Sequence, residues 1–196
     1  MPKQFSFAGF ESASKPTDRL FYAVFPPPDV AAQIAGLAKH LRDERGLKGR
    51  PLHNDRFHIT INHVDDYAGL PPDIVAKATA AGDAVKAAPF EVTFDRAASF
   101  SGRQANRPFV LRGGQALADL KAFQLVLAHA MKANGLGKLV DKMFVPHVTM
   151  LYDGRLVTPQ DVPPITWTVT ELVLVHSLLG QTKHIALKKW PLVAPA

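Results

Sequence analysis

Arg56-Phe57-His58-Ile59-Thr60-Ile61 is the stretch that decides the fold, because its central tripeptide occurs a second time in the chain. The second copy is His147-Val148-Thr149, within the apolar run 145–151. Both copies lie in β-branched, apolar stretches of the kind that form strands. Side chains alternate between the faces of a strand, so each histidine shares a face with the threonine two residues later. Each strand therefore presents an imidazole and a hydroxyl on one face and an apolar surface on the other.

The spacing of the two tripeptides indicates two related halves. His58 and His147 lie 89 positions apart, and their midpoint is close to the middle of the 196-residue chain. Two imidazoles that face each other across a cleft can act as a base and an acid. The hydroxyls of Thr60 and Thr149 can donate hydrogen bonds to the non-bridging oxygens of a phosphate. A lone strand histidine is more often structural, and threonine is a common strand former. The repetition of the motif is what favours chemistry.

The pair of H-x-T motifs resembles the two-histidine (2H) phosphoesterase superfamily, and within it the family of 2′-5′ RNA ligases and RNA 2′,3′-cyclic phosphodiesterases. Other stretches that resemble this family are spread over most of the chain: 19–27, 99–100, 107–111, 171–177 and 190–192. The resemblance implies a bilobal, pseudo-symmetric α+β fold. In that fold two small, mostly antiparallel sheets flank a central cleft, and the helices lie outside.

The same resemblance implies an activity. The family hydrolyses RNA 2′,3′-cyclic phosphate ends to 2′-phosphomonoesters by acid and base catalysis without a metal or cofactor, and reversible 2′-5′ RNA ligation is a second activity. By resemblance, His147 accepts the proton of the attacking water and His58 protonates the departing 3′ oxygen. The residues themselves leave the two histidines equivalent. The expected partners are RNA with 2′,3′-cyclic phosphate ends or cyclic nucleotides.

Two positions depart from the common pattern of the family. Many members have an arginine five residues after the second histidine, where this chain has Tyr152. Many have a tyrosine in the last strand, where this chain has His184. Both side chains can still form hydrogen bonds with a phosphate or a ribose, so they join Thr60 and Thr149 as candidate substrate-binding residues. A packing or surface role is the alternative for each.

Other functions are weighed against this one. Potential metal ligands cluster around the first motif: Asp55, His58, His63, Asp65 and Asp66. However, an odd offset on a continuous strand places His58 and His63 on opposite faces, which argues against a shared metal. No P-loop is present, because Gly113-Gly114-Gln115 lacks the lysine and the spacing. A catalytically idle module that binds RNA ends is a further alternative, as is a phosphodiesterase for 2′-5′ oligonucleotides or small cyclic nucleotides.

The composition is that of a globular protein with a basic surface. Lys and Arg number 23 against 17 Asp and Glu, which gives a net charge of +6. Such a charge suits an RNA partner or serves solubility alone. The absence of cysteine excludes disulfides and thiolate catalysis. No apolar run resembles a signal peptide or a membrane span. We expect a cytoplasmic monomer with a loose tail over 1–17 and a single bilobal domain over 18–196.

Hydrophobic periodicity predicts three helices among seven strands. The first helix follows the prolines 26–28 with Asp29 as its cap and fades by Gly46. The second covers 73 to about 87, and the third covers 115–134 and stops at Gly135. Residues 65–72 and the proline-containing segment 153–164 are expected to be loops. The expected strands are 19–25, 56–64, 90–100, 108–112, 143–151, 167–176 and 183–190.

Overall fold

The computed structural model describes residues 15–101 and 105–194. Most of the expected tail, residues 1–14, therefore lies outside the described residues. Thr17, at the end of that tail, is joined to the first sheet by two backbone hydrogen bonds. Its N–H donates to the carbonyl of Tyr67, and its carbonyl accepts from the N–H of Leu179, both at 2.8 Å.

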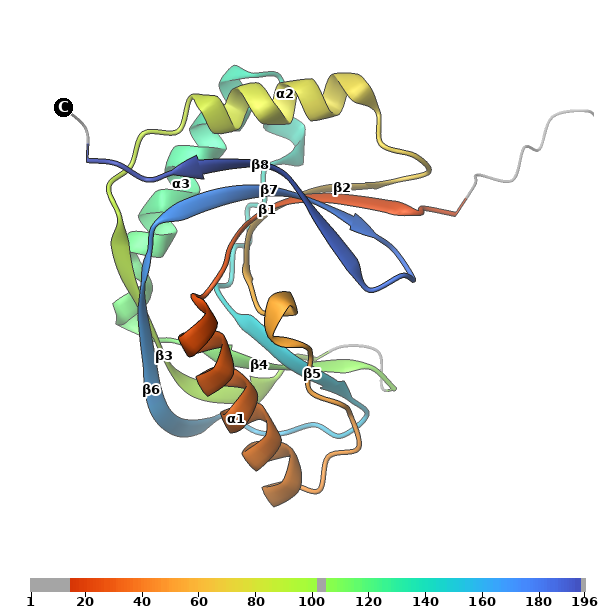
Figure 1. The fold of residues 1–196 in the computed structure, drawn as a ribbon, viewed down its shortest axis with the longest axis vertical. Helices are drawn as coiled ribbons and strands as arrows, with labels where there is room; N and C mark the ends of the chain where they lie inside the picture. The colour runs from red at the N-terminus through yellow and green to blue at the C-terminus, as the bar shows by residue number, and fades with distance from the viewer. Residues whose placement is uncertain (1–14, 102–104, 195–196) are drawn as a thin grey trace, which may run out of the picture.

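The described residues form two four-stranded sheets in which every pair of neighbouring strands is antiparallel. Figure 1 shows the sheets facing each other, the first at the top and the second below. In spatial order, the first sheet contains β2 (Ile59–Tyr67), β1 (Asp18–Val24), β7 (Glu171–Leu178) and β8 (Lys183–Pro191). The second contains β5 (Val148–Asp153), β4 (Arg107–Arg112), β3 (Phe90–Ser99) and β6 (Gln160–Val169). The expected α+β fold with two antiparallel sheets is confirmed, and each H-x-T strand is the edge strand of its sheet.

Three α-helices lie against the sheets in the described part of the chain. Helix α1 (Pro28–Glu44) follows β1 but packs against β5 and β6 of the second sheet. Helix α2 (Pro72–Asp83) packs against β7 and β8, and α3 (Ala118–Ala133) packs against α2, β2 and β3 (Figure 1). Helix α1 contacts the second sheet, although the strand before it, β1, belongs to the first. Helix α3 contacts both sheets. These two helices therefore hold the two lobes together. Three single-turn 3₁₀ helices complete the described fold: η1 (Asn54–Arg56), η2 (Gln115–Leu117) and η3 (Gly137–Leu139).

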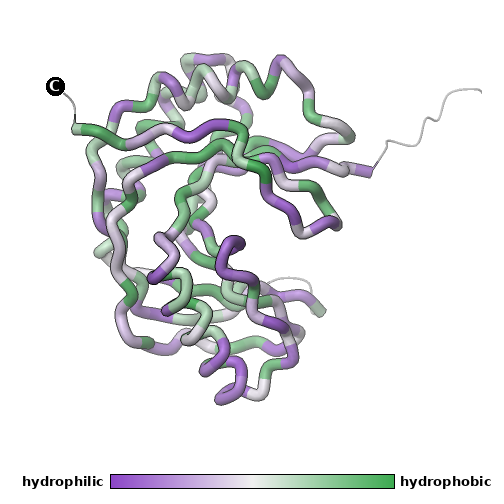
Figure 2. Tube along the Cα trace, in the orientation of Figure 1, coloured by the Kyte–Doolittle hydropathy of each residue, from purple (hydrophilic) through white to green (hydrophobic). Residues whose placement is uncertain are grey.

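The helices form largely where their apolar spacing predicts. The buried face of α1 includes Val30, Ile34 and Leu41, whereas its far end is hydrophilic (Figure 2). The prediction that Asp29 caps this helix is wrong. Pro27 is the N-cap and no side chain caps the helix, while Asp29 lies in the first turn. A carboxylate there still interacts favourably with the helix dipole.

The third helix confirms its predicted apolar stripe and its stop. The residues of that stripe are buried: Leu117, Leu120, Phe123, Leu127 and Met131. Gly135 has a φ of +79°, a conformation that glycine adopts without steric cost. The second helix ends at Asp83, earlier than predicted.

Parts of two predicted loops are strands, whereas residues 68–71 and 154–159 are loops as predicted. Residues 65–67 extend β2, because they pair with β1 and Asp66 forms a two-pronged ion pair with Arg19 across the pair. These contacts outweigh the polar composition that suggested a loop. Pro163 and Pro164 lie inside β6. Strand β6 is an edge strand, and its register with β3 shifts opposite Asp95, where both prolines fall. An edge strand with a bulge tolerates proline, since fewer ladder hydrogen bonds are lost.

The strand predicted over 167–176 is two strands in different sheets. Strand β6 ends at Val169 in the second sheet, and β7 begins at Glu171 in the first. Only Thr170 separates them, and Figure 1 shows the chain running directly from one sheet to the other. An uninterrupted apolar pattern gives no sign of this change of sheet.

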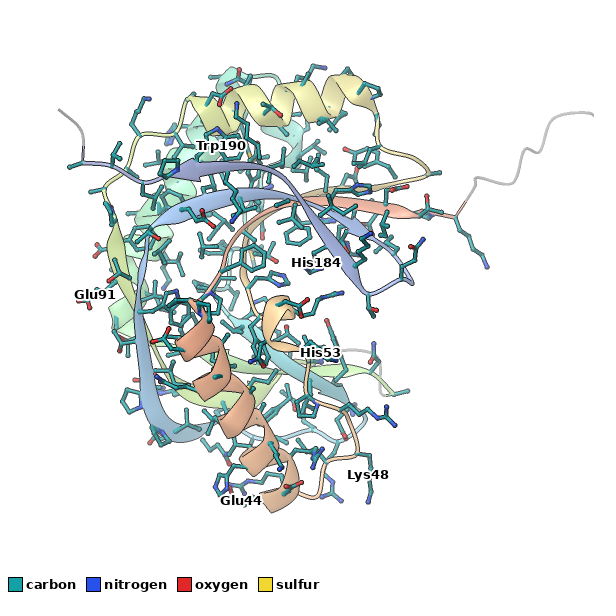
Figure 3. All side chains as sticks on the ribbon, in the orientation of Figure 1. Glu44, Lys48, His53, Glu91, His184 and Trp190 are labelled. Carbon is teal, nitrogen blue, oxygen red and sulfur yellow. The ribbon has the colours of Figure 1, made fainter. Side chains whose placement is uncertain are left out.

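Close packing of α2 on β8 holds the strand that carries His184. Trp190 of β8 lies on the α2 side of the sheet (Figure 3), and its indole N–H donates to Asp83 at 2.6 Å. A Cβ on Gly82 would lie 2.3 Å from ring atoms of Trp190. The indole therefore uses the space that any larger residue at position 82 would occupy.

We predict that Gly82→Ala lowers the melting temperature, although alanine is the better helix former by about 1 kcal/mol. Overpacking against Trp190 costs about 1–3 kcal/mol and outweighs that gain. Gly36→Ala in α1 is the matched control, because nothing lies within 4 Å of the added methyl group, and it should raise the melting temperature. Thermal unfolding of both variants checks the prediction. A rise in the melting temperature of both variants would show that the Trp190 contact does not constrain α2.

Candidate active site

A cavity of about 530 Å³ brings the two H-x-T motifs together. It is lined by residues of both sheets and of the segments that lead into the two motif strands. All of the candidate residues predicted from the sequence line it: His58, Thr60, His147, Thr149, Tyr152 and His184. The repeated tripeptides therefore contribute to one site rather than to two.

Both histidines are held in the same way. Each lies directly before its strand and bonds through Nδ1 to the carbonyl two residues earlier. These carbonyls belong to Arg56 and Val145, and both distances are 2.7 Å. A carbonyl can only accept, so Nδ1 carries the hydrogen in each neutral ring. The backbone thereby fixes the tautomer of His58 and His147 and leaves Nε2 of each to exchange a proton with a ligand.

Burial keeps both imidazoles neutral in the protein alone. It lowers the pKa of His58 to about 4, and the charges of Arg56 and His147 act in the same direction while the backbone hydrogen bond opposes them. Burial likewise lowers the pKa of His147, with a further contribution from Arg112. A bound phosphate has the opposite effect, because an anion stabilises the protonated imidazole. The proton that a general acid needs is therefore held most firmly when the substrate is present.

Phenyl rings pack against both imidazoles. Phe21 and Phe25 lie 5.2 and 5.8 Å from the ring of His58, between ring centroids. Phe100 stands edge-on to His147 at 4.8 Å. These rings exclude water from the histidines and so supply the burial that lowers their pKa values. Sequence reasoning did not single them out as site residues, although Phe21, Phe25 and Phe100 all lie in stretches that resemble the family.

His184 reaches the same cavity from the last strand. It pairs with Ser177 of β7 in the ladder, and Figure 3 shows it on the side of the first sheet that faces the second. Its ring is edge-on to that of His58 at 5.3 Å. Burial, followed by the charges of His58 and Arg56, lowers the pKa of His184 to about 3. This imidazole is therefore neutral and can serve as a hydrogen-bonding partner rather than as a charge.

A β-bulge follows each H-x-T motif at the same position. The extra residue is Ile61 in β2 and Met150 in β5, each directly after the threonine. The first six residues of the two strands also share one pattern of burial. Because a bulge reverses the alternation of faces, the residues five positions after the histidines turn back toward the cavity. These residues are His63 and Tyr152, and both line it.

The prediction that His58 and His63 face opposite sides is therefore wrong, and the bulges explain why. His63 bonds through Nε2 to Asp66 at 3.0 Å, and Asp66 in turn pairs with Arg19. Sharing a cavity does not make the two histidines a metal site. Within residues 15–101 and 105–194, no group of three or more His, Asp or Glu side chains is arranged to hold a metal ion.

Strand β2 holds the segment that leads into the second motif. Asn62 is 1% exposed. Its side-chain oxygen accepts from the N–H of Asp141 at 2.8 Å, and its amide donates to the carbonyl of Leu139 at 2.9 Å. These residues precede His147 in the chain. The side chain of Asn62, beside the first motif, thus holds the segment that leads into the second motif.

Strand β5 returns the same support to the first motif. The carboxylate of Asp153 accepts from the N–H groups of Lys48 and Gly49 at 2.6 and 2.8 Å. The carbonyl of Met150 accepts from Leu52 at 2.8 Å. Glycine is needed at position 49 because a Cβ there would lie 1.9 Å from the carbonyl oxygen of Tyr152. The connector that leads to His58 is therefore attached along the strand of the second motif.

Comparison with known proteins agrees with this arrangement. The family model described as LigT-like phosphoesterase matches residues 24–110, which include the first motif. Over 91% of this chain and 99% of the other, the fold matches that of E. coli LigT in complex with ATP, with a TM-score of 0.64 and 25% identity. The second motif lies within the fold that the two proteins share.

The chain resembles the LigT-like phosphoesterases of the 2H superfamily, both in the family match over residues 24–110 and in the fold that it shares with E. coli LigT. Two further structures share its fold. One is described as a phosphoesterase, with a TM-score of 0.67 and 24% identity over 90% of this chain and 99% of that one. The other, TT0787 of Thermus thermophilus, has a TM-score of 0.67 and 23% identity over 91% of this chain and 100% of that one. No curated protein sequence matches the chain. No helix in the described segments is long and apolar enough to cross a membrane.

The sequence analysis also missed Arg56 as a residue of this LigT-like site. Arg56 lines the cavity, and its Nε and Nη1 atoms are buried without a hydrogen-bond partner. The sequence could have indicated this residue. Arg56 lies two residues before His58, and His58 lies two residues before Thr60, so all three follow the alternation of side chains in a strand. The second motif has no counterpart, because Val145 occupies the equivalent position. An arginine that lines the cavity therefore lies beside the first motif, whereas Arg112 acts on His147 from outside the lining.

Two arginine variants test this electrostatic description. Arg56→Met should raise the pKa of His58 and His184, because loss of a nearby positive charge stabilises the protonated rings. Arg112→Met should instead raise the pKa of His147. NMR titration of the imidazole nitrogens measures each value, with His58 of the unmodified protein expected at about 4. Titration of His58 in its ordinary range, or no response to Arg56→Met, would contradict the buried site described here.

Proposed function

We propose that this phosphoesterase hydrolyses the 2′,3′-cyclic phosphate ends of RNA to 2′-phosphomonoesters, with His58 and His147 as its acid and base. The observation that carries the proposal is the shared cavity. It contains two imidazoles whose Nδ1 atoms are both fixed by backbone carbonyls, together with the hydroxyls of Thr60 and Thr149. Two proton-transfer groups can supply the base and the acid of an in-line displacement at phosphorus, and two hydroxyl donors can stabilise the charge on its non-bridging oxygens.

The reaction then needs one base and one acid on opposite sides of the phosphate. Following the family assignment, Nε2 of His147 takes a proton from water as its oxygen attacks phosphorus. The bond between phosphorus and the 3′ oxygen breaks, and protonated His58 gives its proton to that oxygen. The threonine hydroxyls donate to the non-bridging oxygens, where negative charge increases. The rings afterwards return to their starting protonation states through solvent.

The choice of a nucleotide substrate is supported by a relative. E. coli LigT, which is 25% identical to this chain, has been crystallised with ATP, and in other crystals with NADP⁺ and with 3′-AMP. The net charge of +6 also suits an RNA partner. Ligation uses the same groups if an RNA 5′-hydroxyl takes the place of water, and supply of 5′-hydroxyl RNA to the assay measures it. We further propose that the protein acts in the cytoplasm as a monomer, and sedimentation tests the oligomeric state.

We predict that His58→Ala and His147→Ala each reduce hydrolysis of a 2′,3′-cyclic mononucleotide by about 10²-fold or more. The double variant should lose much less than the product of the two, because the residues act as a unit. His40→Ala is the control, since this imidazole lies on the exposed side of α1 and does not line the cavity of the two histidines.

We also predict that hydrolysis of the cyclic mononucleotide survives EDTA, because the two imidazoles and two hydroxyls supply the proposed chemistry. Loss with EDTA and recovery with a divalent ion would contradict the proposed mechanism.

A substrate with an activated leaving group separates the two roles. Its departure needs little protonation, so turnover by His58→Ala should recover much more than turnover by His147→Ala. Recovery of His147→Ala instead would exchange the roles. No turnover of any cyclic nucleotide, with RNA ends still bound, would identify an idle binding module. Preference for 2′-5′ oligonucleotides or small cyclic nucleotides over RNA ends would replace the proposed substrate.

A further inference from the structure

A second cavity adjoins the one that holds the histidines. Its volume is about 370 Å³, and it shares Arg56, Thr182 and His184 with the first. Pockets for small ligands are typically about 300–1,000 Å³, so the second cavity is large enough for a ligand group of its own. The proposed function makes no use of it. The three shared residues form the boundary between the two spaces.

The floor of the second cavity is apolar. Val173 and Val175 of β7 form it together with Ala186 of β8, and the ring of Phe25 forms one wall. Phe25 is the same ring that packs against His58 in the first cavity. An aromatic wall beside an aliphatic floor suits a flat, apolar ring system such as a nucleobase, because proteins bind unpaired RNA bases by stacking them on aromatic side chains.

A β-bulge gives β8 its charged edge on this cavity. Leu174 pairs with Lys188 and Val175 with Ala186, so Leu187 is the extra residue. The bulge reverses the alternation of faces and brings Ala186 and Lys189 to the same side. Lys189 is paired with Glu171 at 2.9 Å, which neutralises both. The other charged side chains of the lining are those of Asp55, Arg56 and Lys183, so its net charge is small. The cavity therefore suits a ligand of low charge, such as a nucleoside, rather than a polyphosphate.

Unpaired polar atoms gather at the boundary between the cavities. Buried side-chain atoms without a hydrogen-bond partner are rare in proteins. Among the residues that the structure describes there are five such atoms, and three belong to Arg56 and His184. They are Nε and Nη1 of Arg56 and Nδ1 of His184. A buried guanidinium whose N–H groups lack acceptors is suited to a phosphate oxygen.

We infer that the second cavity binds the nucleoside that precedes the cyclic end of an RNA substrate, with Arg56 and His184 on the phosphodiester that joins the two nucleotides. The inference rests on the proposed function, since it assumes that the terminal nucleotide occupies the first cavity. The base of the preceding nucleoside lies on Val173, Val175 and Ala186 beside Phe25. Lys183, which has no ion-pair partner in residues 15–101 and 105–194, lies at the rim near that nucleoside. The protein therefore prefers oligonucleotide ends to cyclic mononucleotides.

The test compares a dinucleotide that ends in a 2′,3′-cyclic phosphate with the matching cyclic mononucleotide. We expect kcat/KM to be at least about tenfold higher for the dinucleotide, the effect of one stacked base. Ala186→Glu places a charge on the apolar floor and should remove that advantage while leaving hydrolysis of the mononucleotide unchanged. Leu187→Glu is the matched control, because it adds the same charge at the neighbouring residue, which lines neither cavity. This control should keep the advantage.

Binding separates this inference from the proposed function. A dinucleoside monophosphate without a cyclic end should bind more weakly to Ala186→Glu than to Leu187→Glu, by about tenfold, whether or not the protein hydrolyses any substrate. Such binding without turnover would overturn the proposed function alone. Hydrolysis of the mononucleotide with no advantage for the dinucleotide, or an advantage that Ala186→Glu retains, would overturn the second-nucleoside site alone.

Discussion

Reciprocal hydrogen bonds, from each motif strand to the segment that leads into the other motif, are the constraint on which the site depends. The side chain of Asn62 on β2 holds the residues that lead to His147, and Asp153 on β5 holds the residues that lead to His58. Each imidazole lies directly before its strand, where backbone geometry is not set by the sheet alone. The segment that leads to His58 is bonded to β5, and the segment that leads to His147 is bonded to β2. These bonds therefore set the positions of the two histidines relative to each other. These side chains are buried, and an unmade hydrogen bond there costs about 1–3 kcal/mol.

The site combines a repeated geometry with unequal electrostatics. The hydrogen bond from Nδ1, the threonine and the bulge recur in both halves. Arg56 and His184 lie on the side of the first motif, where they act on His58. A symmetric framework can supply two proton-transfer groups, but an acid and a base need different environments. The second cavity also lies on the side of Arg56. In the inferred complex the RNA therefore extends from the shared cavity toward the side of the first motif.

The sequence predicted the features that depend on local pattern. The H-x-T strands, the stripe of α3 and the cavity residues His58, Thr60, His147 and Thr149 follow from alternation, helical spacing and repetition. The other two candidates, Tyr152 and His184, came from the family resemblance. The sequence did not predict the bulges at Ile61 and Met150, because neither residue is a glycine or otherwise unusual for a regular strand. For that reason the orientation of His63 was predicted incorrectly. The prolines of β6 and the change of sheet at Thr170 depend on which strands become neighbours, and that is a tertiary property.

Both motifs are expected to act on one phosphate. A crystal structure of the protein with a nucleoside 2′-phosphate, the product of the proposed reaction, tests this claim most directly. We expect the phosphate oxygens to lie within about 3 Å of Nε2 of both His58 and His147, with the hydroxyls of Thr60 and Thr149 donating to the remaining oxygens. A phosphate bound by one motif alone, or outside the cavity that the two motifs share, would contradict the account.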